Sequence, residues 1–364
     1  MTTTPSLAGA ADGLAELDLD ALARYLDAHV DGGLGGPLAA RLVAGGRSNP
    51  TYELLETPAA GDGRSWILRR PPYGEVVAAA AHDMGREARV IGALAGSAVP
   101  VPRVVARCED AAVIGADFYV MEKVEGRTFR TPADTATLTP AERAGLTDSL
   151  VDLLVDLHAV DPAAVGLADF GRPDGYLERQ LARWQRQWAK IRTRDLTGFG
   201  ELAARLERSM PTHGRPGIVH GDYKIDNLMV APDDATRVVA LLDWEMATLG
   251  DTLADVGMLL SFWDEEGGIH NPITAGATAL PGFPDRRTLL ATYAERCGIE
   301  VSDVEWYVVF ADFKLLVILE QIHARHLQGT TVGSGVDDLG PMVPLLLERA
   351  LAGAGAATDP RLRG

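Results

Sequence analysis

The sequence predicts an α+β protein in which a smaller β-rich part precedes a larger, mainly helical part. The chain has 364 residues, more than one average domain, so two lobes or two domains are expected. Short apolar, β-branched runs separated by turn residues fill the stretch from about residue 39 to residue 124. From Thr139 onward, apolar residues recur at helical spacing, which is typical of amphipathic and buried helices.

The composition indicates a soluble globular chain. Hydrophobic residues make up 47% and charged residues 23%, enough for a large core. The formal net charge of −17 disfavours nucleic acid or an anionic membrane as partner. The two cysteines, Cys108 and Cys297, are far apart and predict no disulfide framework. No signal peptide or apolar run of about 20 residues is visible, so we expect a cytoplasmic protein that does not bind membranes.

The first elements follow from local signals. Residues 1–16, small and rich in Ala, Gly and Thr, are expected to form a flexible leader, and Asp18 should cap a helix that ends near Val30. Strands at 41–43 and 51–55 then flank a glycine-rich hairpin tip. The backbone N–H groups of this tip and the Ser48 hydroxyl would suit phosphate binding. An ordinary turn remains the alternative, because the segment lacks a Gly-x-Gly-x-x-Gly pattern.

The next strand, 66–70, ends on two arginines, and strand alternation places Arg69 and Arg70 on opposite faces. A helix over 78–95 follows, and Glu87 lies within its apolar stripe. A buried carboxylate is costly unless it is paired, so Glu87 either has a cationic partner or lies at the edge of the stripe. Further strands are expected at 103–108 and 116–124. A capping box at Thr139, with Pro at the first helical position, then opens a long helix.

The most informative stretch runs from residue 218 to residue 243. Two β-branched runs flank a polar loop that contains Asp222 and Asn227, and a third run ends on Asp243. Asn227 and Asp243 offer the hard oxygens that Mg²⁺ prefers, and Asp222 is left to accept a proton from an attacking hydroxyl. The spacing His-x-Asp-x-x-x-x-Asn followed by a strand-borne Asp is that of a kinase catalytic set. A structural turn in which Asp222 and Asn227 cap local backbone groups is the alternative.

These residues resemble a known family. With Gly221 where protein kinases carry Arg, the sequence His220-Gly221-Asp222 resembles the aminoglycoside phosphotransferase family. The strings 48–52, 220–227 and 242–255 are similar to the branch of kinase-like domains associated with acyl-CoA dehydrogenases. The resemblance covers about residues 15–350. It implies a two-lobed protein-kinase-like fold with ATP and Mg²⁺ as cofactors, divided into an N-lobe (17–124), a C-lobe (125–353) and a tail (354–364).

The resemblance also implies roles for residues of the N-lobe. Kinases hold the phosphates with a Lys where this chain has Arg69, and Arg70 competes for that role. Glu87 would pair with Arg69 and orient it. Ser48 would lie over the phosphates. The residues implied to contact adenine are Met121, Glu122 and Val124.

In the C-lobe, the resemblance implies that Lys224 offsets charge on the transferred phosphoryl group, although it could be a solvated surface residue instead. His220 is expected to support the catalytic loop and not to act as a base. Asp255, on the helix after Asp251, is implied to steady the loop from behind. His158 is expected to be a helix-terminal or core histidine.

The resemblance implies that the acceptor is a small molecule with a hydroxyl group. The long loop 263–283 is a candidate acceptor lid, and its acidic residues 264–266 would suit cationic sugars. The helix over 304–328 instead offers cations that suit an anionic acceptor, namely Lys314, His323, Arg325 and His326. We favour a hydroxyacyl or acyl-CoA-type acceptor, with an aminoglycoside as the alternative. A nucleotide-binding pseudokinase is a further alternative, because Arg replaces Lys at position 69. A homodimer is left open.

Overall fold

The fold is described from a computed structural model, which describes residues 17–43, 49–58, 63–72, 83–268, 270–328 and 339–364. The chain forms two compact units. Unit 1 comprises residues 1–95 and 101–124, and unit 2 comprises residues 96–100 and 125–364. The predicted glycine-rich hairpin tip with Ser48 lies outside the described residues.

Unit 1 is built on a five-stranded antiparallel sheet with strand order β1-β2-β3-β5-β4. The strands are β1 (Leu38–Leu42), β2 (Thr51–Glu56), β3 (Ser65–Arg69), β4 (Val104–Cys108) and β5 (Phe118–Glu122). Leu54, Leu68 and Phe118 are fully buried in its core. Each of the five strands overlaps a predicted run, but β1 has no β-branched residue and begins three residues before the predicted run 41–43.

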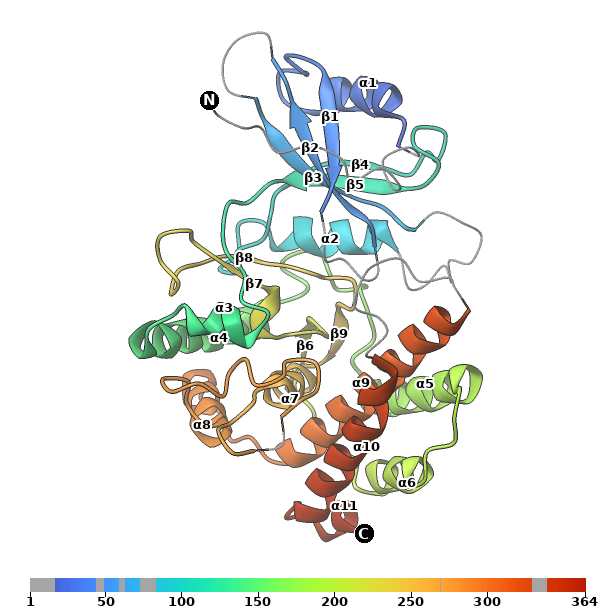
Figure 1. Ribbon diagram of the computed structural model, residues 1–364, viewed down its shortest axis with the longest axis vertical. Helices are drawn as coiled ribbons and strands as arrows, with labels where there is room; N and C mark the ends of the chain where they lie inside the picture. The colour runs from blue at the N-terminus through green and yellow to red at the C-terminus, as the bar shows by residue number, and fades with distance from the viewer. Residues whose placement is uncertain (1–16, 44–48, 59–62, 73–82, 269, 329–338) are drawn as a thin grey trace, which may run out of the picture. The chain divides into compact units, whose positions relative to one another are not determined.

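Two helices cover this sheet, which lies between them in Figure 1. Helix α1 (Leu19–His29) begins at Asp18, whose side chain accepts a hydrogen bond from the N–H of Ala21, so the predicted cap is confirmed. Helix α2 (Met84–Leu94) begins at Asp83, which caps it in the same way. The residues between 78 and 82, which we predicted as the start of this helix, lie outside the described residues. Helix α2 packs against β4 and β5 and carries Glu87 on its buried side.

Unit 2 is mainly helical. The helices are α3 (Pro132–Ala136), α4 (Pro140–Ala159), α5 (Tyr176–Ile191), α6 (Phe199–Arg208), α7 (Leu253–Phe262), α8 (Arg286–Cys297), α9 (Val304–Leu327), α10 (Leu339–Ala356) and α11 (Pro360–Arg363). Helix α9 is buried over most of its length and packs against α5, α6, α7 and α10. A helix that is apolar on nearly all sides has to be enclosed by others, and α9 is therefore the centre of this core (Figure 1).

Two short antiparallel pairs in unit 2 hold the predicted catalytic residues. Strand β6 (Pro216–Val219) pairs with β9 (Thr248–Asp251), and β7 (Leu228–Val230) pairs with β8 (Val238–Leu241). A single 3₁₀ turn, Ile225–Asn227, precedes β7. Strand β9 was not predicted, because its sequence, Thr-Leu-Gly-Asp, lacks β-branched alternation and its pairing is with a segment far away in the chain.

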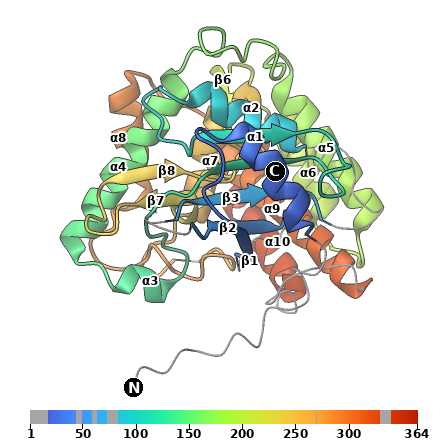
Figure 2. The same ribbon diagram turned by 90° about the horizontal axis from the view of Figure 1, so that it is seen from above.

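Several local predictions can be compared with the structure. The Thr139–Glu142 capping box is present with both of its hydrogen bonds, and Asp285 caps α8 as predicted. Asp251, predicted to cap the following helix, instead ends β9, and its Oδ1 accepts from the N–H groups of Arg215 and Leu253. No helix among the described residues has the length and apolar character needed to cross a membrane. Figure 2, seen from above, shows β1, β2 and β3 of unit 1 side by side.

The segment 354–364 is not the tail that we expected. It contains the end of α10 and the whole of α11, and Leu362 is buried against the unit-2 core. The side chains of Arg205 and Arg208 on α6 donate to the backbone carbonyls of Arg363 and Arg361. Its Gly and Ala content suggested a loose end, but these long-range contacts hold it in place.

Candidate active site

The loop between β6 and β7 brings together three of the predicted residues. The Asp222 Oδ2 atom accepts hydrogen bonds from Asn227 Nδ2 and from Lys224 Nζ, each at 3.0 Å. Asn227 Nδ2 also donates to the backbone carbonyl of Asp222 at 2.8 Å. The 3₁₀ turn at 225–227 shortens the loop and folds the Asn227 side chain back onto Asp222.

The orientation of the Asn227 amide leaves its oxygen available. Both bonds of Nδ2 go to Asp222, and Oδ1 receives no hydrogen bond from any described residue. Asn227 is 8% exposed as a residue, but Oδ1 is not one of the fully buried atoms that lack a partner, so it remains accessible to a ligand. A hard carbonyl oxygen of this kind suits Mg²⁺, which takes few protein ligands. No group of three or more His, Cys, Asp or Glu residues within the described ranges has metal-site geometry, in line with such a sparse ligand set.

Asp243 has an unusual backbone conformation. Its φ is 66°, in the left-handed region, which non-glycine residues seldom adopt and which is frequent at functional sites. The preceding residue, Leu242, is held on both sides. Its N–H donates to the carbonyl of Asn227 at 2.9 Å, and its carbonyl lies 3.0 Å from His220 Nε2. These bonds fix where the chain leaves β8, and thereby place Asp243 near the loop.

His220 has no exposed surface and both of its ring nitrogens are used. Nδ1 accepts from the N–H of Asp222 at 3.2 Å, so Nε2 carries the proton donated to Leu242. The ring also packs 4.7 Å from the Trp244 ring, centroid to centroid. With both nitrogens engaged by backbone groups, His220 supports the loop and cannot also take a proton from a substrate.

Asp255 lies at the start of α7 and is completely buried. Its Oδ2 accepts from the N–H of His220 and its Oδ1 from the N–H of Gly221, both at 2.7 Å. Burial acts to raise the pKa of Asp255, but hydrogen bonds from His158 and the Gly221 N–H outweigh it and hold the pKa below its usual range. An anionic carboxylate therefore holds two consecutive amides directly before Asp222.

Two residues behind Asp255 were not predicted to belong to the site. His158, on α4, has Nε2 at 3.4 Å from Asp255 Oδ2 and Nδ1 at 2.8 Å from the Tyr293 hydroxyl. Burial lowers the pKa of His158, with Asp255 opposing, so the ring is neutral and donates from Nε2. Tyr293 on α8 gives no sequence signal, because only the fold brings α4, α7 and α8 together here.

Lys224 is the positive centre of the loop. Besides Asp222, its Nζ lies 3.6 Å from Asp226 Oδ2, and it stands 4.8 Å from the centroid of the Phe262 ring. Burial acts to lower the pKa of Lys224, but the carboxylates of Asp222, Asp226 and Asp243 together raise it well above its usual range. Lys224 is therefore permanently charged. Asp226 was not predicted as a site residue, because it occupies an unspecified position of the Asp-x-x-x-x-Asn motif that ends at Asn227.

In unit 1, Arg69 and Glu87 form an ion pair, with 2.7 Å between Nη1 and Oε1. The Glu87 side chain is 1% exposed and the Arg69 side chain 12%. Arg70 lies on the other face of β3, is 1% exposed, and donates to the backbone carbonyls of Pro71 and Ile114. The structure therefore separates the two arginines: Arg69 has the carboxylate partner, and Arg70 is buried against backbone.

The predicted adenine-contacting segment follows β5. Met121 is buried, and the N–H of Glu122 donates to the carbonyl of Arg103 at 2.9 Å. The N–H of Val124 has no hydrogen-bond acceptor among the described residues. Val124 is half-buried, and a backbone amide without an acceptor can bind a ligand by hydrogen bonding.

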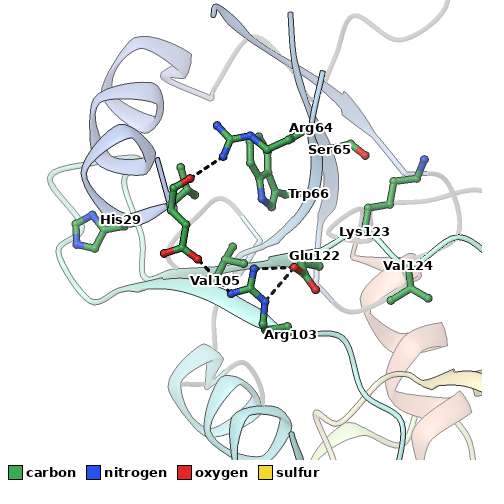
Figure 3. Close-up of a pocket in the computed structure, with 11 residues that line it drawn as sticks. His29, Arg64, Ser65, Trp66, Arg103, Val105, Glu122, Lys123 and Val124 are labelled. Atoms are coloured by element: carbon green, nitrogen blue, oxygen red, sulfur yellow. Dashed lines mark hydrogen bonds and ion pairs between the residues drawn. The ribbon is translucent and has the colours of Figure 1, made fainter. Parts of the chain in front are cut away.

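The same segment borders a polar hollow of about 350 Å³ within unit 1, shown in Figure 3. Each cation at its rim has an acidic partner. Arg103 pairs with Glu122 at 2.7 Å, and Lys123 with Glu53 at 3.1 Å. Arg64 likewise pairs with Glu56 at 2.8 Å. These paired charges make the hollow a solvated surface and not a prepared ligand site.

The two groups expected to contact the acceptor are placed differently from our predictions. Asp264 is 1% exposed and accepts from the N–H groups of Asn271 and Gly276 and from the Thr274 hydroxyl. It therefore holds its own loop together and cannot bind a cationic sugar. Lys314 is also buried, so its ammonium does not face an anionic acceptor.

Comparison with known proteins relates this site to a family. Residues 39–290 match the model of the phosphotransferase enzyme family. The crystal structure of a "putative aminoglycoside phosphotransferase" from Ralstonia eutropha JMP134 is 34% identical, with a TM-score of 0.75, covering 92% of this chain and 98% of that one. A thermostable aminoglycoside phosphotransferase mutant in complex with ADP and hygromycin B shares the fold at 14% identity, with a TM-score of 0.60, covering 94% of this chain and 99% of that one.

Among curated proteins, acyl-CoA dehydrogenase family member 11 of Gallus gallus is 33% identical over 327 residues. The match covers 87% of this chain but only 40% of that protein, so the chain spans about two fifths of the length of such relatives. The match to the family model, over residues 39–290, includes more than half of the chain and parts of both units. The chain therefore belongs to the phosphotransferase enzyme family, with the protein-kinase-like fold of the aminoglycoside phosphotransferases.

Proposed function

We propose that this protein is an ATP-dependent kinase that transfers the γ-phosphoryl group to the hydroxyl of a small molecule. One observation carries the proposal: the Asp222 carboxylate meets the Asn227 amide and the Lys224 ammonium at 3.0 Å, and the Asn227 oxygen is left over. A proton acceptor, a fixed cation and a free hard oxygen in one loop are what phosphoryl transfer to an alcohol requires.

In the proposed reaction, Asp222 accepts a hydrogen bond from the acceptor hydroxyl and takes its proton. The acceptor oxygen bonds to the γ-phosphorus as the bond to the β–γ bridging oxygen breaks. Lys224 offsets negative charge on the phosphoryl oxygens. Asn227 and Asp243 would hold Mg²⁺, which when bound neutralises charge on the donor phosphates. The protein contributes mainly position and electrostatics.

Unit 1 would bind the donor nucleotide. Arg69, oriented by Glu87, would contact its phosphates, as would the Ser48 hydroxyl. The pair at 2.7 Å supports this role, because a guanidinium held by a buried carboxylate keeps one orientation. The residues proposed to contact adenine are Met121, Glu122 and Val124, of which Val124 has an available N–H.

For the acceptor, we favour a hydroxyacyl compound, such as a hydroxyacyl-CoA. The supporting observation is the similarity to proteins named as acyl-CoA dehydrogenase family members, which carry additional sequence beyond this region. An aminoglycoside is the second candidate, because structurally similar proteins carry that name. The burial of Asp264 removes one of the three acidic side chains, 264–266, that we had expected to favour the second candidate, whereas Glu266 is exposed.

The test is a panel of hydroxyacyl-CoAs, free hydroxy acids and aminoglycosides offered with ATP and Mg²⁺. ADP release and the mass of the phosphorylated product are the readouts. Turnover of hydroxyacyl-CoAs alone supports the favoured acceptor, and turnover of aminoglycosides alone replaces it with the second. Nucleotide-dependent thermal stabilisation without ADP release from any acceptor would indicate a nucleotide-binding protein that lacks catalysis.

A further inference from the structure

Lys314 lies in the middle of α9 and is one of three buried charged residues of this helix, together with Asp312 and Glu320. It is 8% exposed, and its Nζ donates to the backbone carbonyl of Gly221 at 2.5 Å. The ammonium also stands 6.0 Å from the centroid of the Trp184 ring. A buried ammonium is costly unless it has a partner, so this contact with the catalytic loop needs a physical reason.

Gly221, whose carbonyl accepts this hydrogen bond, occupies a position that requires glycine. Its φ is +86°, and an added Cβ would lie 2.8 Å from the carbonyl oxygen of Met246. Its N–H is held by Asp255 on α7, and its carbonyl by Lys314 on α9. Both polar atoms of this residue are therefore held by buried charged side chains from separate helices. The carbonyl belongs to the peptide group that leads directly into Asp222.

The surroundings exclude a direct role in acceptor binding. The cavity beside Lys314 has a volume of about 10 Å³ and is lined by Tyr176, Gln180 and Met258, among others. That space holds one water molecule at most. An acceptor cannot enter it, so the ammonium acts on the loop itself.

The charged groups around Lys314 come from three directions. Asp222 and Asp255 attract its positive charge, whereas Arg183 on α5 and Lys224 in the loop repel it. The ammonium points toward the loop that contains Asp222, because its Nζ donates to the Gly221 carbonyl.

We propose that Lys314 is a positioning residue for phosphoryl transfer, which fixes the Gly221 carbonyl and through it the direction of the Asp222 carboxylate. This inference rests on the proposed function. Without the ammonium, the Gly221–Asp222 peptide loses the donor on its carbonyl and is held only through the Asp222 N–H, which donates to His220 Nδ1, so its orientation is less tightly fixed. The rate of transfer then falls, whereas nucleotide binding, which involves other residues, is kept.

The pH dependence separates positioning from a purely structural role. Burial lowers the pKa of Lys314 to about 8 from its ordinary 10.5, against the pull of Asp222 and Asp255. Between these values the unfolded chain holds a proton that the folded chain lacks, so Lys314 makes the folded state more stable as the pH rises through this window. If Lys314 had only a structural role, the rate of phosphoryl transfer would therefore not fall as the pH rises from about 8 to 10.5. A positioning lysine loses its charge-assisted bond, and the rate falls while stability rises.

The experiment compares K314M and K314R with K190M, which removes an exposed lysine on α5. In K314M we expect kcat to fall about 10- to 100-fold, as for a misplaced catalytic group, with the KM for ATP changed less than about twofold. In K314R, whose guanidinium stays charged, the loss of rate above about pH 8 should disappear. K190M should behave like the wild type. Unchanged kcat in K314M, or the same alkaline loss in K314R, would overturn the proposal.

Hydrogen exchange supplies a readout that does not depend on turnover. In K314M the amides of residues 220–222 should exchange faster, while those of α10 exchange as in the wild type. If the wild type transfers no phosphoryl group, the proposed function fails, yet faster exchange of this segment in K314M still supports Lys314 as the residue that orders the loop. Wild-type exchange rates in a folded K314M variant would contradict it.

Discussion

The N–H of Asp222 donates to His220 Nδ1 at 3.2 Å, so the proposed proton acceptor is tied to the histidine two residues before it. The other nitrogen of the same ring donates to the carbonyl of Leu242, next to Asp243. One neutral imidazole thus connects the loop of the proposed base with the strand end that carries the proposed metal ligand. Each connection can be removed separately.

His220→Asn and His220→Gln separate these two hydrogen bonds. The Asn oxygen can replace Nδ1 and keep the Asp222 contact, whereas the Gln amide nitrogen can replace Nε2 and keep the Leu242 contact. We expect His220→Gln to lower kcat and His220→Asn to weaken Mg²⁺-dependent nucleotide binding. Each buried backbone group left unpaired should cost about 1–3 kcal/mol of stability. Equal effects on both kinetic constants would contradict separate roles.

Asp222→Asn tests the proton acceptor. An amide of the same shape cannot take the proton of the acceptor hydroxyl, so kcat should fall by roughly 10²- to 10⁴-fold with nucleotide affinity nearly unchanged. Kinetics by ADP release and titration calorimetry with ATP and Mg²⁺ give the two quantities. Asp233→Asn, at an exposed turn between β7 and β8, is the control. A wild-type rate in Asp222→Asn would remove this residue from the mechanism.

Asp243→Asn tests the metal ligand without disturbing the backbone. Asn tolerates the left-handed conformation that Asp243 adopts at φ 66°, so the fold should be kept. Loss of the carboxylate should abolish Mg²⁺-dependent nucleotide binding, which calorimetry with and without Mg²⁺ can show. Asp303, with φ 57°, offers a matched control, and Asp303→Asn should bind nucleotide normally. Unaltered affinity in Asp243→Asn would refute the assignment.

Glu87→Gln tests the ion pair in unit 1. The change removes the buried negative charge that pairs with Arg69, so the free energy of unfolding should fall by roughly 3 kcal/mol. The KM for ATP should also rise. The exposed pair of Asp233 and Arg237 is the comparison, and breaking it should cost less than about 1 kcal/mol. Denaturant unfolding measures the free energy of unfolding of both variants. Equal losses would show that burial of the ion pair does not determine its contribution to stability.

The buried histidine on α4 predicts loss of stability in acid. Because burial lowers the pKa of His158, the unfolded chain takes up a proton near the ordinary value of 6.5 that the folded chain does not. Stability should therefore fall as the pH drops below 6.5. His158→Gln, which keeps one donor and one acceptor, should show a smaller slope over this range in thermal unfolding. An identical slope would assign the acid sensitivity to other groups.

The parts of the fold with local signals could be predicted from the sequence. Asp18, Thr139 and Asp285 cap helices through bonds to residues three positions away, and such contacts need no knowledge of the rest of the chain. Strand β9 could not be predicted, because it is a strand only through its pairing with β6. The helical end at 354–364 was missed for the same reason, since its partners lie on α6.

The residues of the candidate site also divide into those with a local sequence signal and those placed only by long-range contacts. The spacing of Asp222, Asn227 and Asp243 identified the loop. The contact of Lys314 with Gly221 and the contact of Tyr293 with His158 each join segments that are far apart in sequence, so no local pattern indicates them. Within the acidic run at 264–266, the expected role of Asp264 was wrong, because composition cannot show that its side chain is buried.

The way in which Gly221 is held from two helices affects how natural variants of this chain should be judged. A copy that has lost its cation at position 314, or its carboxylate at position 255, would keep every letter of the His-Gly-Asp and Asn signature. Scanning genomes for that signature would count such a copy as an active enzyme. Deciding which copies have lost activity therefore requires that positions 255 and 314, which lie downstream of the signature, are inspected as well.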